Sequence, residues 1–495
     1  MYDKAVALYL DKDIVYTDEW PYHPDKGYPE LKQIFTTEFP LNPANKVYSA
    51  VREVFNILGM DSKNFGSDTW NPFSEIIKPG QTVLIKPNLV MHEMGQQTSL
   101  NTMHTHGSLI RAVADYALIA LKGDGKLIVA DSPLQGADFE KLTQETGLNE
   151  LKDWYRKNGI HHFEFYDLRK EWARLSTRGG MTMERISLKG DPLDYCLVKL
   201  EKDSALEKVT KPETRFGITD YKDTTLQNNH QEGIHNYLVA RSVLEADVIL
   251  NLPKLKTHTK TGLTACLKNL VGINGSKDFL PHYRQGSVKE GGDEFPYKNI
   301  ANVLFKKVRD TLNERAPLVF WKIARWLGLR FRHIYSSMFD CSERNSWGIP
   351  TSMIYGGSWY GNDTAWRMVH DLNTILLFAD KSGKIKESKQ RKCFSLVDAI
   401  IAGEGEGPLS PSSKHCGLII SGVDSLRIDI IAASIMGYDI NKIPLLSSYY
   451  QTNFSDFNPK RDKIQVLSNI NKTDNWYKGL FDFIPTQGWL NHIEL

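Results

Sequence analysis

The sequence predicts an α/β fold: a mostly parallel sheet core covered by helices, with an antiparallel side sheet and a helical, partly basic amphipathic insertion. Three observations predict this class. Short apolar runs end at Pro or Asn, as strands buried on both faces do. Amphipathic helical segments alternate with these runs along the chain. The composition, 41% hydrophobic and 24% charged, is that of an ordinary globular protein.

A first βαβ unit is expected between residues 81 and 131. Residues 81–88 have the pattern of a buried strand, 108–121 that of an amphipathic helix closed by Gly123, and 126–131 that of the next strand. Because a helix joins the two strands, we expect them to pair in parallel. Ligands of such sheets bind beyond the carboxyl ends of the strands.

The same order recurs further along the chain. We expect a helix from His235 to Ala246, a strand over 247–252, and another helix from about Thr261 to Val271. Near the C-terminus, 416–424 is predicted as a strand and 425–436 as a helix stopped by Gly437, with Asp424 as its N-cap. Alternating runs between residues 163 and 200 predict the antiparallel side sheet.

The 495 residues allow two to four units at roughly 150 residues per domain. We expect an N-terminal extension packed on the core, a first core part with the side sheet, an insertion, a second core part and a C-terminal extension, at 1–80, 81–274, 275–390, 391–445 and 446–495. In the insertion, the run between Leu318 and His333 has one apolar and one basic helical face. It is either a helix packed on the body or a helix that docks on a membrane surface.

Charge and cysteine content exclude several classes. With 61 Lys and Arg against 59 Asp and Glu, the net charge of +2 provides no chain-wide field for nucleic acid. The five cysteines are far apart, which favours neither a disulfide framework nor a CxxC metal site and suggests a reducing compartment. Without a secretory signal or a long apolar run, we expect a cytoplasmic protein; if the basic helix docks on a membrane, the contact is peripheral, at the inner membrane face.

The run from Asn251 to Gly262, followed by 266–272, carries the densest candidate chemistry. It places Lys254, Lys256, His258 and Lys268, with Asn269, on one expected strand, loop and helix. Lysines so close together repel one another unless solvent, carboxylates or a bound anion compensates them. A phosphate or carboxylate ligand would do so, with help from the backbone N–H groups of a helix start. The alternative is a solvated basic loop in which His258 makes a structural hydrogen bond.

Two further groups of polar residues are expected near the same edge. Lys86 and Asn88 follow the first strand, and His104 and His106 precede the next helix. The histidine spacing is compatible with a divalent metal, for which His104, His106 and His258 are the candidate ligands. Alternatively, His106 caps the helix that begins near Gly107, and His104 is exposed.

Carboxylates could complete such a site. Asp131 ends the second strand, and Glu404 and Glu406 alternate with glycines between residues 403 and 408. These groups can act as acids, bases or metal ligands. The alternatives are a turn-forming or helix-capping Asp131 and a plain flexible turn at 403–408.

Taken together, several runs resemble the uncharacterised domain-of-unknown-function family numbered 362. They lie between about residues 80 and 440, outside the insertion, at 83–88, 129–133, 246–258, 267–272, 397–408 and 424–437. The resemblance implies a shared α/β core but no known reaction. Many members carry a ferredoxin-like module with clustered cysteines; this chain has no such cluster, so we expect no iron–sulfur cluster.

Two fainter similarities concern function. The strand-lysine-histidine region is similar to the nickel-pincer lactate racemase family, in which lysine and histidine hold a metal–nucleotide cofactor; no residue assignment follows from it. Residues 358–368, with Asp371 and Asn373, look like a segment of relatives associated with surface-polysaccharide gene sets.

We therefore expect an enzyme that acts on a small anionic substrate, phosphorylated, carboxylated or sugar-derived, with the assistance of a divalent metal. In this hypothesis, lysines neutralise anionic oxygens, histidines act as metal ligands or acid–base groups, and carboxylates complete the site. The residues are Lys86, Lys254, Lys256 and Lys268; His106 and His258; and Asp131, Glu404 and Glu406. The alternative is a non-catalytic ligand-binding or assembly protein at the cytoplasmic membrane face. The sequence predicts neither the reaction type nor the oligomeric state.

Overall fold

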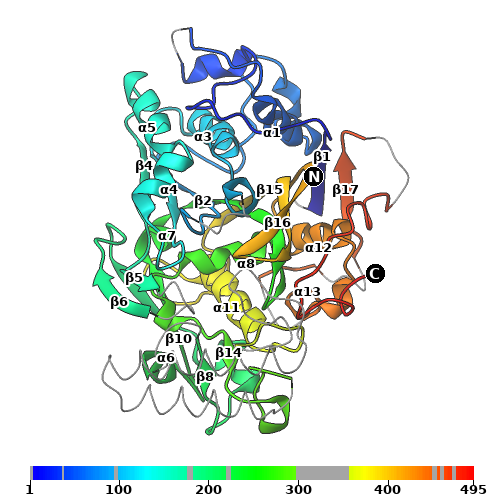
Figure 1. The fold of residues 1–495 in the computed structure, drawn as a ribbon. Helices are drawn as coiled ribbons and strands as arrows, with labels where there is room; N and C mark the ends of the chain where they lie inside the picture. Colours follow the sequence, from blue (N-terminus) through cyan, green and yellow to red (C-terminus); the bar gives the residue numbers. More distant parts are fainter. Residues whose placement is uncertain are drawn as a thin grey trace.

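A large mixed sheet forms the centre of the molecule (Figure 1). The computed structural model describes residues 4–35, 38–93, 99–175, 182–218, 224–296, 356–448, 454–457, 462–470 and 475–495. Within them, eight strands run across the sheet in the order β17 (Gln465–Ser468), β1 (Ala5–Leu10), β16 (Ser410–Gly422), β15 (Lys392–Glu406), β11 (Val248–Leu252), β2 (Thr82–Pro87), β3 (Lys126–Asp131) and β4 (Phe163–Asp167).

The predicted parallel core is confirmed. β15, β11, β2, β3 and β4 are parallel to their neighbours in that order. On the other flank, β15 and β16 form a long antiparallel hairpin, and β1 pairs antiparallel to β16 and parallel to β17. Strands from both ends of the chain, within the stretches expected as extensions, therefore belong to the sheet itself.

Helices cover both faces of the sheet, because its central strands are apolar on both sides. Val83 and Ile85 of β2 pack into one core and Leu84 into the other. Helices α1 (Lys46–Ile57) and α3 (Gly107–Leu121) lie on the first face, and α8 (Cys266–Asn269), α11 (Ala365–Phe378) and α12 (Ser425–Ile435) on the second (Figure 1). The remaining helices are α2 (Leu100–Met103), α4 (Phe139–Glu145), α5 (Leu148–Lys157), α6 (Thr224–Asn229), α7 (Arg241–Glu245) and α13 (Pro444–Ser447).

Helix caps follow the sequence with one difference. The Asp424 carboxylate accepts hydrogen bonds from the N–H groups of Leu426 and Arg427, so its prediction as the α12 N-cap is confirmed. At the end of α3, the first left-handed residue is Lys122, with φ of 53°, and Gly123 follows with φ of 77°. The helix therefore ends as predicted, although lysine supplies its first left-handed residue.

Small antiparallel sheets are present, but they are separate. β5 (Glu171–Leu175) pairs with β6 (Thr182–Ser187), and β7 (Tyr195–Lys199) pairs with β10 (Ile234–Ala240), which also pairs with β9 (His230–Gln231). β8 (Phe216–Gly217) and β14 (Tyr283–Arg284) form another pair. The first alternating run of the expected side sheet became β4 of the main sheet instead.

Three local predictions are wrong. The first half of the helix expected over 235–246 is strand β10, and only the second half is helical, as α7. The expected loop after Pro253 is strand β12 (Lys254–His258), which pairs with β15 and with β13 (Gly262–Thr264). The helix expected over 261–271 is therefore reduced to α8 and a 3-10 turn at Leu270–Ile273. Non-local strand pairing decided all three.

The described residues bear on membrane contact in one respect. Among them, no helix has both the length and the apolar character needed to cross a bilayer. The basic amphipathic run between Leu318 and His333 lies outside the described residues. The membrane-docking hypothesis for it stays a prediction.

Candidate functional site

The candidate site lies where the direction of the sheet reverses. From β2 the chain proceeds through α3 to β3 and β4, whereas β11 lies on the other side of β2 and next to β15. In open α/β sheets, the crevice beyond the carboxyl ends of two such strands is the usual ligand site. The residues after β2, β3 and β11 therefore meet at one edge.

A cavity of about 320 Å³ opens at this edge. Its wall combines the ends of β2 and β3, strands β12 and β13, helix α8 with the turn after it, and residues 356–368. Seven of the predicted site residues line it: Lys86, Asn88, Asp131, Lys256, His258, Lys268 and Asn269. Apolar side chains form another part of the wall, among them Leu89, Val90, Leu134, Val271, Leu280 and Met368.

Lys86 and Asp131 form a buried ion pair in this wall. Lys86 Nζ lies 2.6 Å from Asp131 Oδ1, and Asp131 Oδ2 accepts a hydrogen bond from Leu89 N. Burial lowers the pKa of the Lys86 ammonium and raises the pKa of the Asp131 carboxyl, in each case against the attraction of the partner. A Cβ on Gly272 would lie 2.3 Å from Asp131 Oδ1, so only glycine allows the chain to pass so close to the pair.

Lys256 brings an ammonium group into the cavity without a carboxylate partner. The residue is 1% exposed, and its Nζ donates to Asn88 Oδ1 and to the Met103 carbonyl, each at 2.7 Å. Burial, and then the charges of Lys254 and Lys268, lower the pKa of Lys256 well below its usual value. A bound anion would remove this penalty, because it would compensate the buried positive charge.

Lys268 is the second such lysine. It lines the cavity from α8, is less buried than Lys256, and has no hydrogen-bond or ion-pair partner among the described residues. Burial, and then the charge of Lys86, lower the pKa of Lys268 to about 8. The ammonium and the neutral amine forms of Lys268 are therefore both present at pH values near 8.

Two buried polar atoms of the wall also have no hydrogen-bond partner among the described residues. They are Thr264 Oγ1 and Asn269 Oδ1, on residues that are 4% and 3% exposed. Asn269 Nδ2, in contrast, donates to the Lys86 carbonyl and to Asn251 Oδ1. Because buried polar atoms rarely stay without hydrogen bonds, these two atoms indicate room for a polar ligand.

His258 faces the cavity as a neutral imidazole. Burial, and then the charges of Lys268, Lys260 and Lys256, lower its pKa well below the usual value. Its Nδ1 accepts a hydrogen bond from Lys260 N at 3.0 Å, which leaves the proton on Nε2. His258 is thus a hydrogen-bond donor toward a ligand rather than a base, since Nε2 carries no free lone pair in this tautomer.

Two other predicted residues belong to a separate buried cluster. Lys254 Nζ lies 3.1 Å from Asp398 Oδ2 and 2.7 Å from the Tyr16 hydroxyl, and His106 stacks on Tyr16. His106 Nδ1 accepts a hydrogen bond from Ser108 N, so it caps α3, which was the stated alternative for this residue. Neither Lys254 nor His106 lines the cavity.

The predicted metal ligands do not meet. In the part of the chain that the structure describes, no three side chains of His, Cys, Asp or Glu gather as a metal site would require. His104 is buried, not exposed, and its Nε2 accepts a hydrogen bond from Met91 N. With His106 capping a helix and lysines around His258, these three histidines do not fit one cation.

Glu404 and Glu406 do not reach the cavity either. The expected flexible turn is the end of strand β15, and Glu404 forms an ion pair with Lys414 at 2.7 Å. The Glu404 and Glu406 carboxylates accept the N–H groups of Ile484 and Gln487. Of this region, Pro408 and Leu409 line the cavity.

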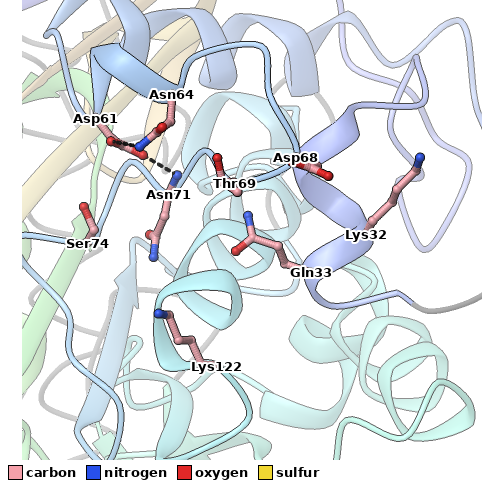
Figure 2. Close-up of a pocket in the computed structure, with 9 residues that line it drawn as sticks. All are labelled: Lys32, Gln33, Asp61, Asn64, Asp68, Thr69, Asn71, Ser74 and Lys122. Atoms are coloured by element: carbon pink, nitrogen blue, oxygen red, sulfur yellow. Dashed lines mark hydrogen bonds between the residues drawn. The ribbon is translucent and has the colours of Figure 1, made fainter.

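A second hollow of about 480 Å³ lies near the N-terminal helices (Figure 2). Its wall holds Lys32 and Lys122 together with Asp61 and Asp68, so its charges balance. Figure 2 shows that Asp61 turns toward Asn64 and Asn71, whose side-chain and backbone N–H groups it accepts at 2.8 Å. None of the predicted site residues lies here, and the excess of positive charge is at the other cavity.

Several wall residues were missed by the sequence analysis, including Thr264, Gly272, His282 and Ser358. Gly272 had a usable signal, because it ends a run that was singled out. Thr264 had none, since its role depends on the pairing of β13 with β12. His282 and Ser358 lie in the stretch that was set aside as an insertion.

The chain was compared with known proteins. One solved structure, a crystal structure of a protein from Thermotoga maritima, aligns at 13% identity and a TM-score of 0.32, over 78% of this chain and 57% of that chain. No curated protein matches. The family model described as a domain of unknown function, DUF362, matches residues 204–434, which include β11, β12, α8 and the β15–β16 hairpin. This match confirms the resemblance to the DUF362 family over residues 204–434.

Proposed function

We propose that the protein is an enzyme that binds a small organic anion, phosphorylated, carboxylated or sugar-derived, in the cavity at the ends of β2, β3 and β11. One observation carries the proposal. Among the described residues of the wall, Asp131 is the one carboxylate, and it is paired with Lys86, so that Lys256 and Lys268 have no negative partner.

The wall can bind an anion with groups of complementary character. As an ammonium, Lys256 has a third N–H beyond the two that Asn88 and Met103 accept, and His258 has its Nε2–H. Hydrogen bonds between such groups and an anionic oxygen are strong because they are charge-assisted and screened from water. The apolar part of the wall suits the carbon skeleton of an organic anion better than a bare inorganic ion.

Chemistry on this ligand has two candidate acid–base groups. Burial shifts the pKa of the Asp131 carboxyl upward and that of Lys268 down to about 8, so burial favours the neutral form of both groups. The proposal includes no metal, because the described residues gather no set of ligands from the three histidines and the cavity is lined by lysines.

The link to surface-polysaccharide metabolism remains part of the proposal. The segment that suggested it contributes Ser358, Ala365 and Met368 to the wall. The alternative, a non-catalytic protein at the membrane face, depends on residues 318–333, which lie outside the described part of the chain.

Titration calorimetry with inorganic phosphate and with acetate tests the site. We expect binding to the wild type and a loss of about tenfold to a hundredfold in affinity for Lys256→Met, since a hydrogen bond to a charged group contributes about 1.5–3 kcal/mol. Lys122→Met, which removes a lysine from the N-terminal hollow, is the matched control and should bind normally. Equal binding by all three proteins would overturn the proposal.

A second measurement separates an enzyme from a binding protein. Phosphorus and proton NMR would follow a panel of phosphorylated and carboxylated sugars incubated with the wild type and with Lys256→Met. Conversion by the wild type alone supports an enzyme. Binding without any conversion across the panel favours the non-catalytic alternative.

A further inference from the structure

The cavity holds one lysine whose surroundings differ from those of the others. Lys86 is paired with Asp131, Lys256 donates to Asn88 and Met103, and Lys260 donates to the Gly356 carbonyl. Lys268 lines the same cavity, and none of the described residues accepts a hydrogen bond from its Nζ or pairs with it. Lys256 is held by two hydrogen bonds and still faces the cavity. Anion binding alone therefore gives no reason why Lys268 should have no such hydrogen bonds among the described residues.

The neutral form of Lys268 is favoured by its neighbours. Burial disfavours its ammonium form first, the charge of Lys86 does so next, and no carboxylate of the described residues pairs with it. The pKa of about 8 leaves about half of Lys268 as free amine at pH 8, against less than about 1% for a lysine of the usual 10.5. Desolvation and a neighbouring cation are the two devices that make lysine a nucleophile.

Other polar groups line the same cavity as Lys268. Lys256 and His258 supply N–H donors for an anionic group, and Thr264 Oγ1 and Asn269 Oδ1 have no partner among the described residues. A nucleophile that shares its cavity with anion-binding groups and with such polar atoms suits a compound with an anionic group and a second, electrophilic polar group. Asn269 Oδ1 can accept a hydrogen bond from a hydroxyl group of the ligand, and the Thr264 hydroxyl can donate one to it.

From this geometry we propose that Lys268 forms an imine with the carbonyl carbon of an anionic aldehyde or ketone bound in the cavity. The inference rests on the proposed function, because it names the substrate class of the same site. In the first step, the Lys268 lone pair forms a C–N bond, the carbonyl π pair moves to oxygen, and a proton passes from nitrogen to that oxygen. In the second, the C–O bond breaks and the hydroxyl leaves as water with the remaining N–H proton. Amine and carbonyl become imine and water without oxidation or reduction.

Reductive trapping tests the proposal directly. The full-length protein is incubated at pH 8 with glyoxylate, an aldehyde that carries a carboxylate, and sodium cyanoborohydride, and the modified lysines are mapped by mass spectrometry. We expect one main adduct, on Lys268, formed about tenfold faster than adducts on surface lysines, because its larger free-amine fraction outweighs its lower basicity. Its rate should rise with pH around 8 and then level off.

Three comparisons make the outcome specific. Acetaldehyde lacks the anionic group and should label Lys268 much less than glyoxylate does. Inorganic phosphate should protect Lys268, because it occupies the anion site and stabilises the ammonium form. Lys268→Arg should lose the adduct, whereas in the control variant Lys157→Arg, which changes an exposed lysine, Lys268 should be labelled at the rate of the wild type.

The result also separates this inference from the proposed function. If phosphate binds but Lys268 is labelled no faster than surface lysines, the imine is overturned and the anion site stands. Labelling that moves to another cavity lysine, or that acetaldehyde achieves equally well, overturns the imine in the same way. If neither phosphate binding nor selective labelling is found, both proposals fail.

Discussion

At the scale of single residues, β12 carries two buried lysines, of which one has a carboxylate partner and the other has none among the described residues. Lys254 and Lys256 are both almost fully buried and lie two positions apart, but Lys254 is paired with Asp398 whereas Lys256 has no carboxylate. Breaking a buried ion pair costs more than removing a buried charge that has no counter-charge. The two lysines should therefore differ in what they contribute to stability and to binding.

We predict that Lys254→Met lowers the free energy of unfolding by about 3–5 kcal/mol, because it leaves Asp398 buried and unpaired. Lys256→Met should lower it by no more than about 1.5 kcal/mol, since the loss of two hydrogen bonds is offset by the removal of a buried charge that has no counter-charge. Urea denaturation of the two variants measures both values. A larger loss for Lys256→Met than for Lys254→Met would contradict the charge assignment.

The residues of the candidate site could be predicted where they lie at the end of a strand that could itself be predicted. Lys86, Asn88 and Asp131 follow or end recognisable strands, and parallel pairing brings such ends together. Lys254 and His106 could not be excluded in advance, because Asp398 and Tyr16, which hold them elsewhere, are far away from them in sequence. A local pattern carries no information about such partners.

At the scale of elements, the tip of the β15–β16 hairpin holds the C-terminal segment. Glu404 pairs with Lys414 and accepts Ile484 N, and Gly405 N donates to the Ile484 carbonyl. These bonds give Glu404 a structural role, whereas a catalytic role was expected from the sequence. Both groups are partly exposed, so their contribution is that of a surface ion pair.

We predict that Glu404→Gln lowers the free energy of unfolding by about 1 kcal/mol or less, and changes the phosphate affinity by less than about twofold. The amide keeps a carbonyl oxygen for Ile484 N but loses the charge opposite Lys414. Thermal unfolding and calorimetry measure the two quantities. A tenfold loss of affinity would return Glu404 to the ligand site.

The start of α8 is held by a carboxyl group from α12. Asp429 accepts the N–H groups of Cys266 and Leu267, at 2.7 and 2.9 Å. Burial raises the pKa of Asp429 from 3.8 to about 7. Since the folded state then keeps its proton at a pH where the unfolded chain has lost it, stability must fall as pH rises from about 4 to 7.

We predict that this fall disappears in Asp429→Asn. A rise in pKa from 3.8 to about 7 corresponds to roughly 4 kcal/mol, all of it lost above pH 7 and none below pH 4. The stability curves of the wild type and variant, from urea denaturation across this range, should therefore approach each other toward low pH once the constant cost of the changed cap is subtracted. Parallel curves would show that Asp429 titrates normally.

The elements that the sequence misjudged share one cause. The run 235–246 has helical spacing, but Tyr237 and Val239 pair across to β7, and Lys256 of β12 pairs to Gly403 of β15. Pairing with a distant strand overrides local propensity, and the distant partner is not visible in the local pattern. The units around β2, β3, β11 and α12 were predictable because their periodicity agrees with the final packing.

At the scale of the whole molecule, distant parts of the chain complete both the sheet and the cavity. β1 and β17, from opposite ends of the sequence, pair at one flank of the sheet. The cavity lies away from that flank, and its wall comes from five separated stretches: 86–90, 131–135, 256–282, 356–368 and 408–409. A bound anion should therefore link regions of the chain that are far apart in sequence.

Hydrogen exchange measured with and without inorganic phosphate tests whether a bound anion links these regions. We predict slower exchange with phosphate in the stretches of the wall, because a ligand in the cavity restrains their opening. At about 100 times the dissociation constant, the amides that exchange by global unfolding should also slow, by about 2.7 kcal/mol in apparent stability. Edge strand β17 should change little, since local opening at the sheet edge does not depend on the cavity.

The same experiment on Lys256→Met is the control that assigns the effect to the cavity. This variant should show the exchange pattern of the ligand-free wild type at every phosphate concentration that the wild type responds to. Protection that persists in Lys256→Met, or that gathers at 32–33, 61–74 and 122 around the N-terminal hollow, would place the anion there instead. Because that hollow carries equal numbers of lysines and aspartates and the cavity at the strand ends carries unpaired lysines, we expect the protection at the strand ends.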